Sequence, residues 1–197
     1  MKKALIALAA MAVSTGAIAG PAWTYADLGY VQATSGDEAS DAFEIRGSFG
    51  FANIWHVQAG YADGEIAGGK SKSGADVDGY YIRGGIHPAV TDNTDFVLDL
   101  AWEQASIDTG SSSKPEPDAI SIRTGVRSNI GKLELRSFVT MSYGSTDTGS
   151  NDDFTAIGYQ IGGQYNFSDA WSVGLDTAIA SSVQSLGTDT SNLYVRW

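Results

Sequence analysis

Apolar and polar residues alternate along most of this chain with a period of two. The clearest case is the range 95–105, where large apolar residues occupy every second position and carboxylates stand between them. The apolar residues are Phe96, Leu98, Leu100 and Trp102, and the carboxylates are Asp95, Asp99 and Glu103. Side chains of a β-strand point alternately to its two faces, so the pattern predicts a strand with one apolar and one polar face. Beyond the first residues, no segment shows the period of 3.6 that is typical of a helix.

The same alternation predicts ten strands, with eight as the alternative. The expected strands cover 26–34, 42–52, 55–62, 79–86, 95–105, 119–128, 132–143, 156–167, 171–180 and 191–197. Five of the connections are mostly long and polar, and begin at Ser35, Asp63, Ser106, Gly144 and Ser181. The other four are mostly short. Transmembrane barrels of the outer-membrane type have an even number of antiparallel strands, short turns on the periplasmic side and longer external loops. The pattern therefore predicts an all-β, antiparallel, up-and-down transmembrane barrel.

The distribution of aromatic residues favours lipid over a shared protein core as the partner of the apolar face. Aromatic residues on this face gather at strand ends, where a membrane barrel carries its two interfacial girdles. Near the long loops they are Tyr30, Phe43, Tyr61, Tyr80, Trp102, Tyr143 and Tyr159, and near the short turns Phe51, Trp55, Phe96, Tyr165, Phe167, Trp171 and Trp197. The alternative, a secreted sandwich or small soluble barrel, gives no reason to sort aromatic residues by depth.

All six arginines fall on the polar face of an expected strand. We expect them to meet inward carboxylates inside the barrel, in a lumen charge network of thirteen residues. Its members are Asp27, Glu44, Arg46, Arg83, Asp95, Asp99, Glu103, Arg123, Arg127, Glu134, Arg136, Asp176 and Arg196. In the strand expected at 132–143, Phe138 is the one large apolar side chain that the alternation places on this face. Because about eight strands leave an interior that side chains just fill, we expect the lumen of a ten-stranded barrel to be largely filled.

The first nineteen residues have the composition of a secretory signal peptide. Lys2 and Lys3 form the charged start, the range 4–13 is the apolar core, and Ala17 and Ala19 form an A-x-A cleavage site before Gly20. The apolar core is shorter than the roughly 20 residues that a membrane-spanning helix needs. Residues 20–197 then form the barrel domain. The chain has no cysteine, which excludes a disulfide framework and a thiol nucleophile.

The net charge of the chain argues against one class of partner. Without the signal peptide the chain has 10 basic and 23 acidic residues, a formal charge of −13. Nucleic acid is therefore not expected as a partner.

The chain resembles small bacterial outer-membrane β-barrels of the porin-like, opacity-like group. The features that carry the resemblance are the signal peptide, the dyad-repeat strands and the ending Leu193-Tyr194-Val195-Arg196-Trp197. It implies that Trp197 is the terminal aromatic residue of the assembly signal and that the barrel assembly machinery inserts the chain. Outer-membrane lipid and lipopolysaccharide are then the surroundings, and we expect a monomer.

Three candidate chemistries are weak. The range 64–71 satisfies G-x-x-x-x-G-K-[ST], but the helix that a phosphate-binding loop needs does not follow. Its Lys70 and Lys72, with Lys114, are candidates for contact with lipopolysaccharide phosphates. Some outer-membrane barrels are proteases or acylate or deacylate lipids, and they act at the external rim. Both histidines of this chain, His56 and His87, fall at the periplasmic end, far from that rim. Acidic loops, such as those containing Asp41 and Asp153, lack calcium-loop spacing, so plain solvated loops are favoured over cation bridges.

We therefore expect no enzyme activity, no cofactor and no metal site. The expected function is that of a structural or surface-interaction protein of the outer membrane, with acidic external loops and a charged, mostly filled lumen. A narrow porin-like channel for small solutes is the alternative.

Overall fold

The computed structural model describes residues 22–35, 38–67, 74–108, 110, 114–147, 151–182 and 188–197. The predicted signal peptide, residues 1–19, lies outside the described residues. In the described part, no helix is long and apolar enough to cross a membrane.

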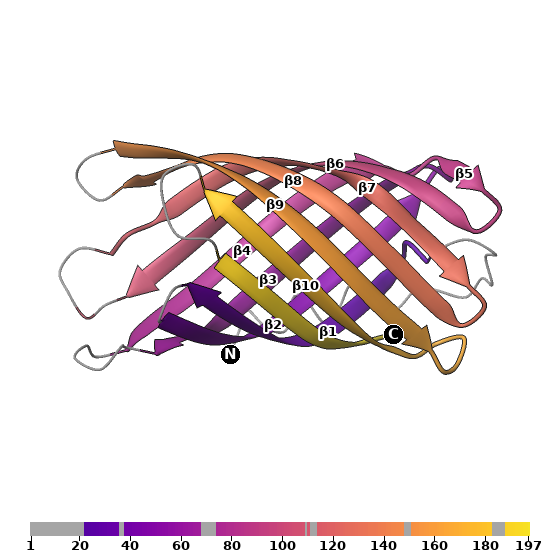
Figure 1. Ribbon diagram of the computed structural model, residues 1–197, viewed down its shortest axis with the longest axis horizontal. Helices are drawn as coiled ribbons and strands as arrows, with labels where there is room; N and C mark the ends of the chain where they lie inside the picture. The colour runs from indigo at the N-terminus through magenta and orange to yellow at the C-terminus, as the bar shows by residue number, and fades with distance from the viewer. Residues whose placement is uncertain are drawn as a thin grey trace.

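Ten long antiparallel strands and one short strand form a closed barrel. Figure 1 shows the long strands steeply inclined to the barrel axis, with the short strand β5 at one end. The strands are β1 Tyr25–Ser35, β2 Glu38–Phe51, β3 Trp55–Ala67, β4 Ala75–Ile86, β5 Ala89–Thr91, β6 Thr94–Asp108, β7 Pro117–Ile130, β8 Leu133–Asp147, β9 Asn151–Asn166, β10 Ser172–Ser182 and β11 Thr188–Arg196. The prediction of a ten-stranded antiparallel barrel is thus confirmed.

The barrel closes between its first and last strands. Nine residue pairs join β1 to β11, from Asp27 opposite Arg196 to Ser35 opposite Thr188. Elsewhere each long strand pairs with its neighbours in chain order, and β4 pairs directly with β6 past the short β5. Closure leaves every long strand with two partners, so no long strand presents a free edge.

The two faces of the wall are as different as the alternation predicts. Large apolar side chains point outward and stay exposed, for example Leu100, Ile122 and Ile161 near the middle of their strands. The aromatic residues assigned to the strand ends are also exposed, except that Trp197 is half-buried beside Trp171 with ring centroids 5.9 Å apart. The inward face carries the charged residues. Phe138 also points inward and is buried, as expected.

The strands extend further toward the long loops than the alternation predicts, and here the predicted boundaries are wrong. Strand β3 continues to Ala67 and β4 begins at Ala75, although the range 63–76 was expected to be a loop. Its carboxylates stand opposite one another on the outward face, Asp63 opposite Asp78 and Glu65 opposite Asp76. The backbone ladder continues there although the side chains have lost their apolar alternation. These outward carboxylates form an acidic rim near the long loops. Outward strand positions are therefore free of charge only on the side of the rim that faces the short turns.

The short connections contain backbone conformations that favour particular residues. Ala52 and Asn53, between β2 and β3, have φ of 50° and 62°, and Gly131 between β7 and β8 has φ of 63°. Consecutive residues with positive φ belong to the tight turns that match the twist of a hairpin. The expected turn at 87–94 instead contains β5, whose pairing with β6 is irregular.

A cysteine pair tests the closure of the barrel. Gln32→Cys together with Ser191→Cys should form a disulfide under oxidising conditions, because these residues stand directly opposite each other across the β1–β11 seam. Gln32→Cys with Thr177→Cys is the matched control, since Thr177 lies one strand further around, opposite Ser191. Two strand spacings are roughly 10 Å, beyond the reach of a disulfide. The measurement is the mobility of the folded protein on non-reducing gels. Equal cross-linking of both pairs would contradict the closed register.

Candidate functional site

The interior of the barrel is the candidate site, because the thirteen charged residues singled out above all project into it. Most are buried, and Asp27, Asp99, Arg127 and Glu134 are exposed by no more than 2%. They form two ionic clusters, one centred on Asp27 and Glu134 and one on Asp99. Asp95 stands apart, because its partners are aromatic residues.

Asp27 on β1 binds two arginines. Arg196 donates from Nε to Oδ1 over 2.6 Å and from Nη2 to Oδ2 over 2.8 Å. Arg46 donates from Nε to Oδ2 over 3.1 Å. The two-pronged geometry of a guanidinium matches that of a carboxylate, which gives such pairs their directional specificity. Asp27 thereby joins β1 to the neighbouring strands β2 and β11 from the inside.

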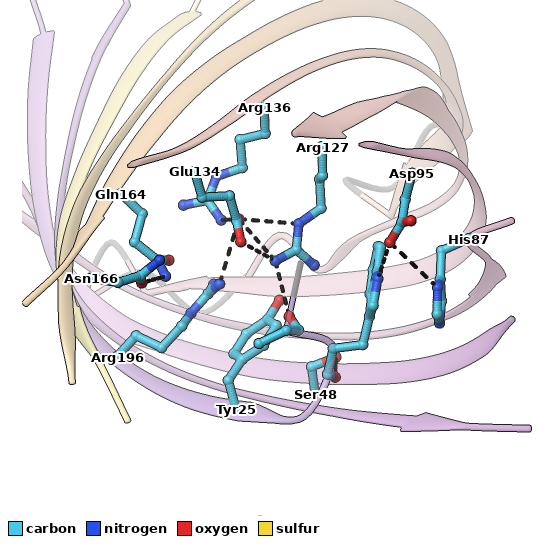
Figure 2. Close-up of polar contacts among 12 residues, drawn as sticks. Tyr25, Ser48, His87, Asp95, Arg127, Glu134, Arg136, Gln164, Asn166 and Arg196 are labelled. Carbon is cyan, nitrogen blue, oxygen red and sulfur yellow. Dashed lines mark hydrogen bonds and ion pairs between the residues drawn. The ribbon is translucent and has the colours of Figure 1, made fainter. Parts of the chain in front are cut away.

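Glu134 on β8 is the meeting point of three arginines (Figure 2). Arg127 donates from Nη2 to both carboxylate oxygens, at 2.8 and 2.9 Å, and from Nε at 3.1 Å. Arg136 Nη1 and Arg196 Nη1 lie 3.5 and 3.9 Å from Oε1. A single buried carboxylate therefore faces three guanidinium groups from β7, β8 and β11.

Asp176 on β10 completes a ring of alternating charges. Its Oδ1 accepts a hydrogen bond from Arg136 Nε over 2.7 Å, and its Oδ2 lies 3.7 Å from Arg46 Nη1. The ring runs in the order Asp27, Arg196, Glu134, Arg136, Asp176 and Arg46, and then returns to Asp27. It links β1, β2, β8, β10 and β11 across the lumen. Each ion pair is tied to the next, so the loss of one member affects both neighbours.

Aromatic rings pack against these guanidinium groups. The ring of Tyr194, which is 1% exposed, has Arg46, Arg136 and Arg196 at 4.8 to 5.4 Å from its centroid. Arg196 also lies 3.4 Å from the centroid of Tyr25. Gly174 makes room for this packing, because a Cβ there would collide with the Tyr194 hydroxyl group. Cation–π contacts of this kind add to the ion pairs.

The second ionic cluster centres on Asp99 of β6. Arg123 donates to Oδ2 from Nε over 2.8 Å and from Nη2 over 2.5 Å. His56 Nε2 lies 2.9 Å from Oδ1. Arg83 is held more loosely, since it donates to Gln58 over 3.2 Å and its Nη2 lies 3.7 Å from Glu103. The remaining acid, Glu44, lies 3.7 Å from Arg46 Nε and accepts a hydrogen bond from Asn192.

The segment before β1 folds back into the turn end of the barrel and plugs it. The ring of Trp23 stacks between His56 and His87, with centroid distances of 4.2 and 4.1 Å. Its Nε1 donates to Asp95 Oδ2 over 2.7 Å, and its carbonyl oxygen accepts from Ser48 over 2.8 Å. Sequence reasoning missed this plug, because Trp23 precedes the first alternating strand. The one sequence feature that could have indicated the plug is the presence of both histidines at this end of the barrel.

The outer half of the lumen has a different lining. Inward positions of the strands on the side of the long loops carry mostly uncharged residues, which include the small Ala42, Ala62, Ala105, Ala156 and Ala178 and the larger Ile66, Val77, Ile107 and Phe154. These alanines are half-exposed although they point inward, so water reaches the interior on this side. The barrel thus has a plugged half in which most of the charges are buried and a more open half whose inner wall is mostly uncharged.

The structure bears on the weaker candidates as well. Residues 64–67 of the phosphate-loop motif belong to β3, and residues 68–71 lie outside the described ones, as do Lys70 and Lys72. The ammonium group of Lys114 is paired with Asp108 over 2.5 Å. Across the part of the chain that the structure describes, no group of three or more histidine, cysteine or acidic residues is arranged to hold a metal ion.

Comparison with known proteins agrees with the fold. No protein-family model matches the chain, and no curated protein matches it. The solved structures that it resembles include the NanC porin, with a TM-score of 0.50 and 9% identity over 86% of this chain and 98% of that one. The translocator domain of the autotransporter NalP from Neisseria meningitidis has a TM-score of 0.49 and 10% identity over 100% of this chain and 93% of that one. Ail, the attachment invasion locus protein of Yersinia pestis, has a TM-score of 0.41 and 13% identity over 88% and 97%. At these identities, the similarity to the NanC porin supports the closed barrel fold and nothing finer.

Removal of one carboxylate tests the ionic ring. Glu134→Gln should lower the free energy of unfolding by about 3–5 kcal/mol, because it leaves three guanidinium groups facing an uncharged amide in a buried site. Glu65→Gln, an exposed residue of the acidic rim, is the matched control and should change stability little. Urea unfolding of the refolded barrel, followed by tryptophan fluorescence, measures both. Equal midpoints for the two variants would show that the ring does not stabilise the fold.

Proposed function

We propose that this chain is an integral outer-membrane β-barrel protein with a structural or surface-interaction role and a lumen closed at its periplasmic end. The observation that carries the proposal is the outward face, where large apolar side chains remain exposed on all ten long strands. Soluble monomers rarely expose a contiguous apolar surface of more than a few hundred Å². Hydrocarbon is the surrounding that such a face requires.

The asymmetry of the two ends supports an orientation. The tight turns and the Trp23 plug are placed at the periplasm, and the long connections and the acidic rim outside, as in known outer-membrane barrels. Signal-peptide cleavage before Gly20, and assembly through a terminal signal ending at Trp197, fit the same location. Outer-membrane lipid, lipopolysaccharide and the barrel assembly machinery are the proposed partners of a monomeric barrel.

The acidic rim favours a surface role. The rim extends from β3 and β4 onto the neighbouring strands β2 and β6. Its longest row of opposed outward carboxylates consists of Asp41, Glu65, Asp76 and Asp108. Like charges directly opposite each other on neighbouring strands destabilise a sheet. A row that is kept in spite of this cost suits contact with cationic groups outside the cell.

A narrow channel is the second candidate, and the open outer half of the lumen is what favours it. The plugged half argues for little conduction, because Trp23, Tyr194 and the ionic ring occupy much of the interior there. Neither histidine is placed for catalysis at the external rim, since His56 and His87 flank Trp23 at the other end. A role without enzyme activity is therefore part of the proposal.

A charge on the outward face tests the membrane location. Leu100→Arg should destabilise the barrel in lipid vesicles by about 2–4 kcal/mol, the cost of an arginine near the midplane. Gln104→Arg is the matched control on the same face of β6, beyond Trp102, where the cost falls to about 0–1 kcal/mol. The measurement is the fraction of protein that migrates as the folded, heat-modifiable form at increasing urea. If Leu100→Arg behaves like the control, the outward face does not contact hydrocarbon.

Planar bilayer recording separates the two functional candidates. A structural barrel should show small or no conductance, and removal of the Trp23 ring in Trp23→Ala should leave it small, because the ionic ring remains. A channel should show steady openings in the wild-type protein, whose size changes when inward arginines such as Arg46 are replaced. Steady openings of porin size in the wild-type protein would overturn the proposal of a closed lumen.

A further inference from the structure

A cavity of about 150 Å³ remains between the plug and the open outer half of the lumen. All six arginines of the chain line it. Of the seven interior carboxylates, only Glu44 and Asp176 belong to the lining. Aromatic rings, among them Tyr25, Tyr81 and Phe138, form most of the remaining wall. The cavity surface is therefore richer in cationic donors than the interior as a whole.

The uneven lining follows from the way the ion pairs are oriented. Asp27, Asp99 and Glu134 are exposed by no more than 2% and are covered by the guanidinium groups that bind them. Asp95 and Glu103 also lie outside the lining. A solute in the cavity thus meets guanidinium groups first and most carboxylates only behind them.

Several of these guanidinium groups retain N–H groups without an acceptor. Arg136 Nη2, Arg196 Nη1 and Arg83 Nε are buried atoms that have no hydrogen-bond partner. Arg136 and Arg196 are more than nine-tenths buried. Glu134 Oε1 lies 3.9 Å from Arg196 Nη1, beyond hydrogen-bond distance. Their accessible surface is close to zero, so an anion in the cavity reaches them after a small turn of the guanidinium group, and such an acceptor is favourable because buried donors are almost always satisfied in folded proteins.

We propose that this cavity binds a small oxyanion, of the class of inorganic phosphate, sulfate or a short carboxylate, with Arg136 and Arg196 donating to its oxygens and Arg83 at its edge. The planar donor fork of arginine matches the oxygen spacing of such anions. The cavity is smaller than the roughly 300–1,000 Å³ of sites for drug-sized ligands, which limits the ligand to a few non-hydrogen atoms. The half-exposed inward residues of the outer half, among them Ala62 and Ala105, give the anion a wet path from the external side.

This site goes beyond the proposed envelope role, because a barrel that is closed to transport still binds an anion from outside. It also differs from the described part of the phosphate-loop motif, residues 64–67, and from the external Lys114, since neither lines the cavity.

Titration calorimetry of the full, folded chain in detergent micelles tests the site, with sodium phosphate and sodium sulfate as titrants at constant ionic strength. The wild-type protein should bind one anion per chain with a saturable isotherm. Arg136→Lys, which keeps the charge and removes Nη2, should weaken binding at least tenfold. Arg83→Gln should also weaken it, and this variant is expected to fold because Arg83 makes only loose contacts. Heat-modifiable migration checks that each variant is folded.

Lys114→Gln is the matched control, since Lys114 is an external cation paired with Asp108. Its isotherm should equal that of the wild-type protein. Absence of saturable binding to the folded wild-type protein would overturn the proposal. So would an isotherm that Lys114→Gln abolishes while Arg83→Gln leaves it unchanged, because the anion would then be bound on the outer surface, where lipopolysaccharide phosphates lie.

Discussion

Charge neutralisation inside the barrel is the constraint on which the rest of this structure depends. A guanidinium group that leaves water loses several kcal/mol of hydration, and only a well-placed carboxylate with good hydrogen bonds compensates for that loss. Here the compensation is shared around a ring, in which Asp27, Glu134 and Asp176 each face two or more arginines. The charged groups thus remain inside, and the outward face is left to apolar side chains over the middle of every long strand.

The ring also explains the choice of neighbouring residues on the inner wall. Large side chains such as Tyr194 fit between the arginines only because adjacent strands offer glycine. Gly174 leaves space for the Tyr194 ring, and Gly162 leaves space for Asp176 beside Arg136. The plug extends the same packing to the turn end, where Arg127 lies 4.2 Å from the centroid of Trp23 and also binds Glu134. Ionic and aromatic contacts therefore form one connected network in the plugged half of the barrel.

Much of this arrangement could be predicted from the sequence, because a period of two is a direct consequence of strand geometry. The alternation in 95–105 placed Asp99 inward and Leu100 outward, as the structure has them. The strand ends were not predictable in this way, since around Asp63 and Asp78 the outward positions are acidic and no longer apolar, and only the backbone ladder continues. The pairing of each arginine with its carboxylate could not be predicted from the sequence either. Arg136 and Asp176 are 40 residues apart, and their contact depends on the register and tilt of β8, β9 and β10. The inward position of Trp23 was not predictable for a third reason, because a single residue before the first strand has no periodicity.

The central claim is that the charged and aromatic filling is shielded from lipid while the outward face contacts it, and the tryptophans test this most directly. Trp23 is buried inside the barrel, whereas Trp102 is exposed on the outward face of β6. Variants that keep only one of these two tryptophans, with phenylalanine at the other tryptophan positions, are reconstituted in vesicles of brominated phospholipid. The account predicts strong quenching of Trp102 fluorescence and little quenching of Trp23. Equal quenching of the two, or unquenched Trp102, would contradict it.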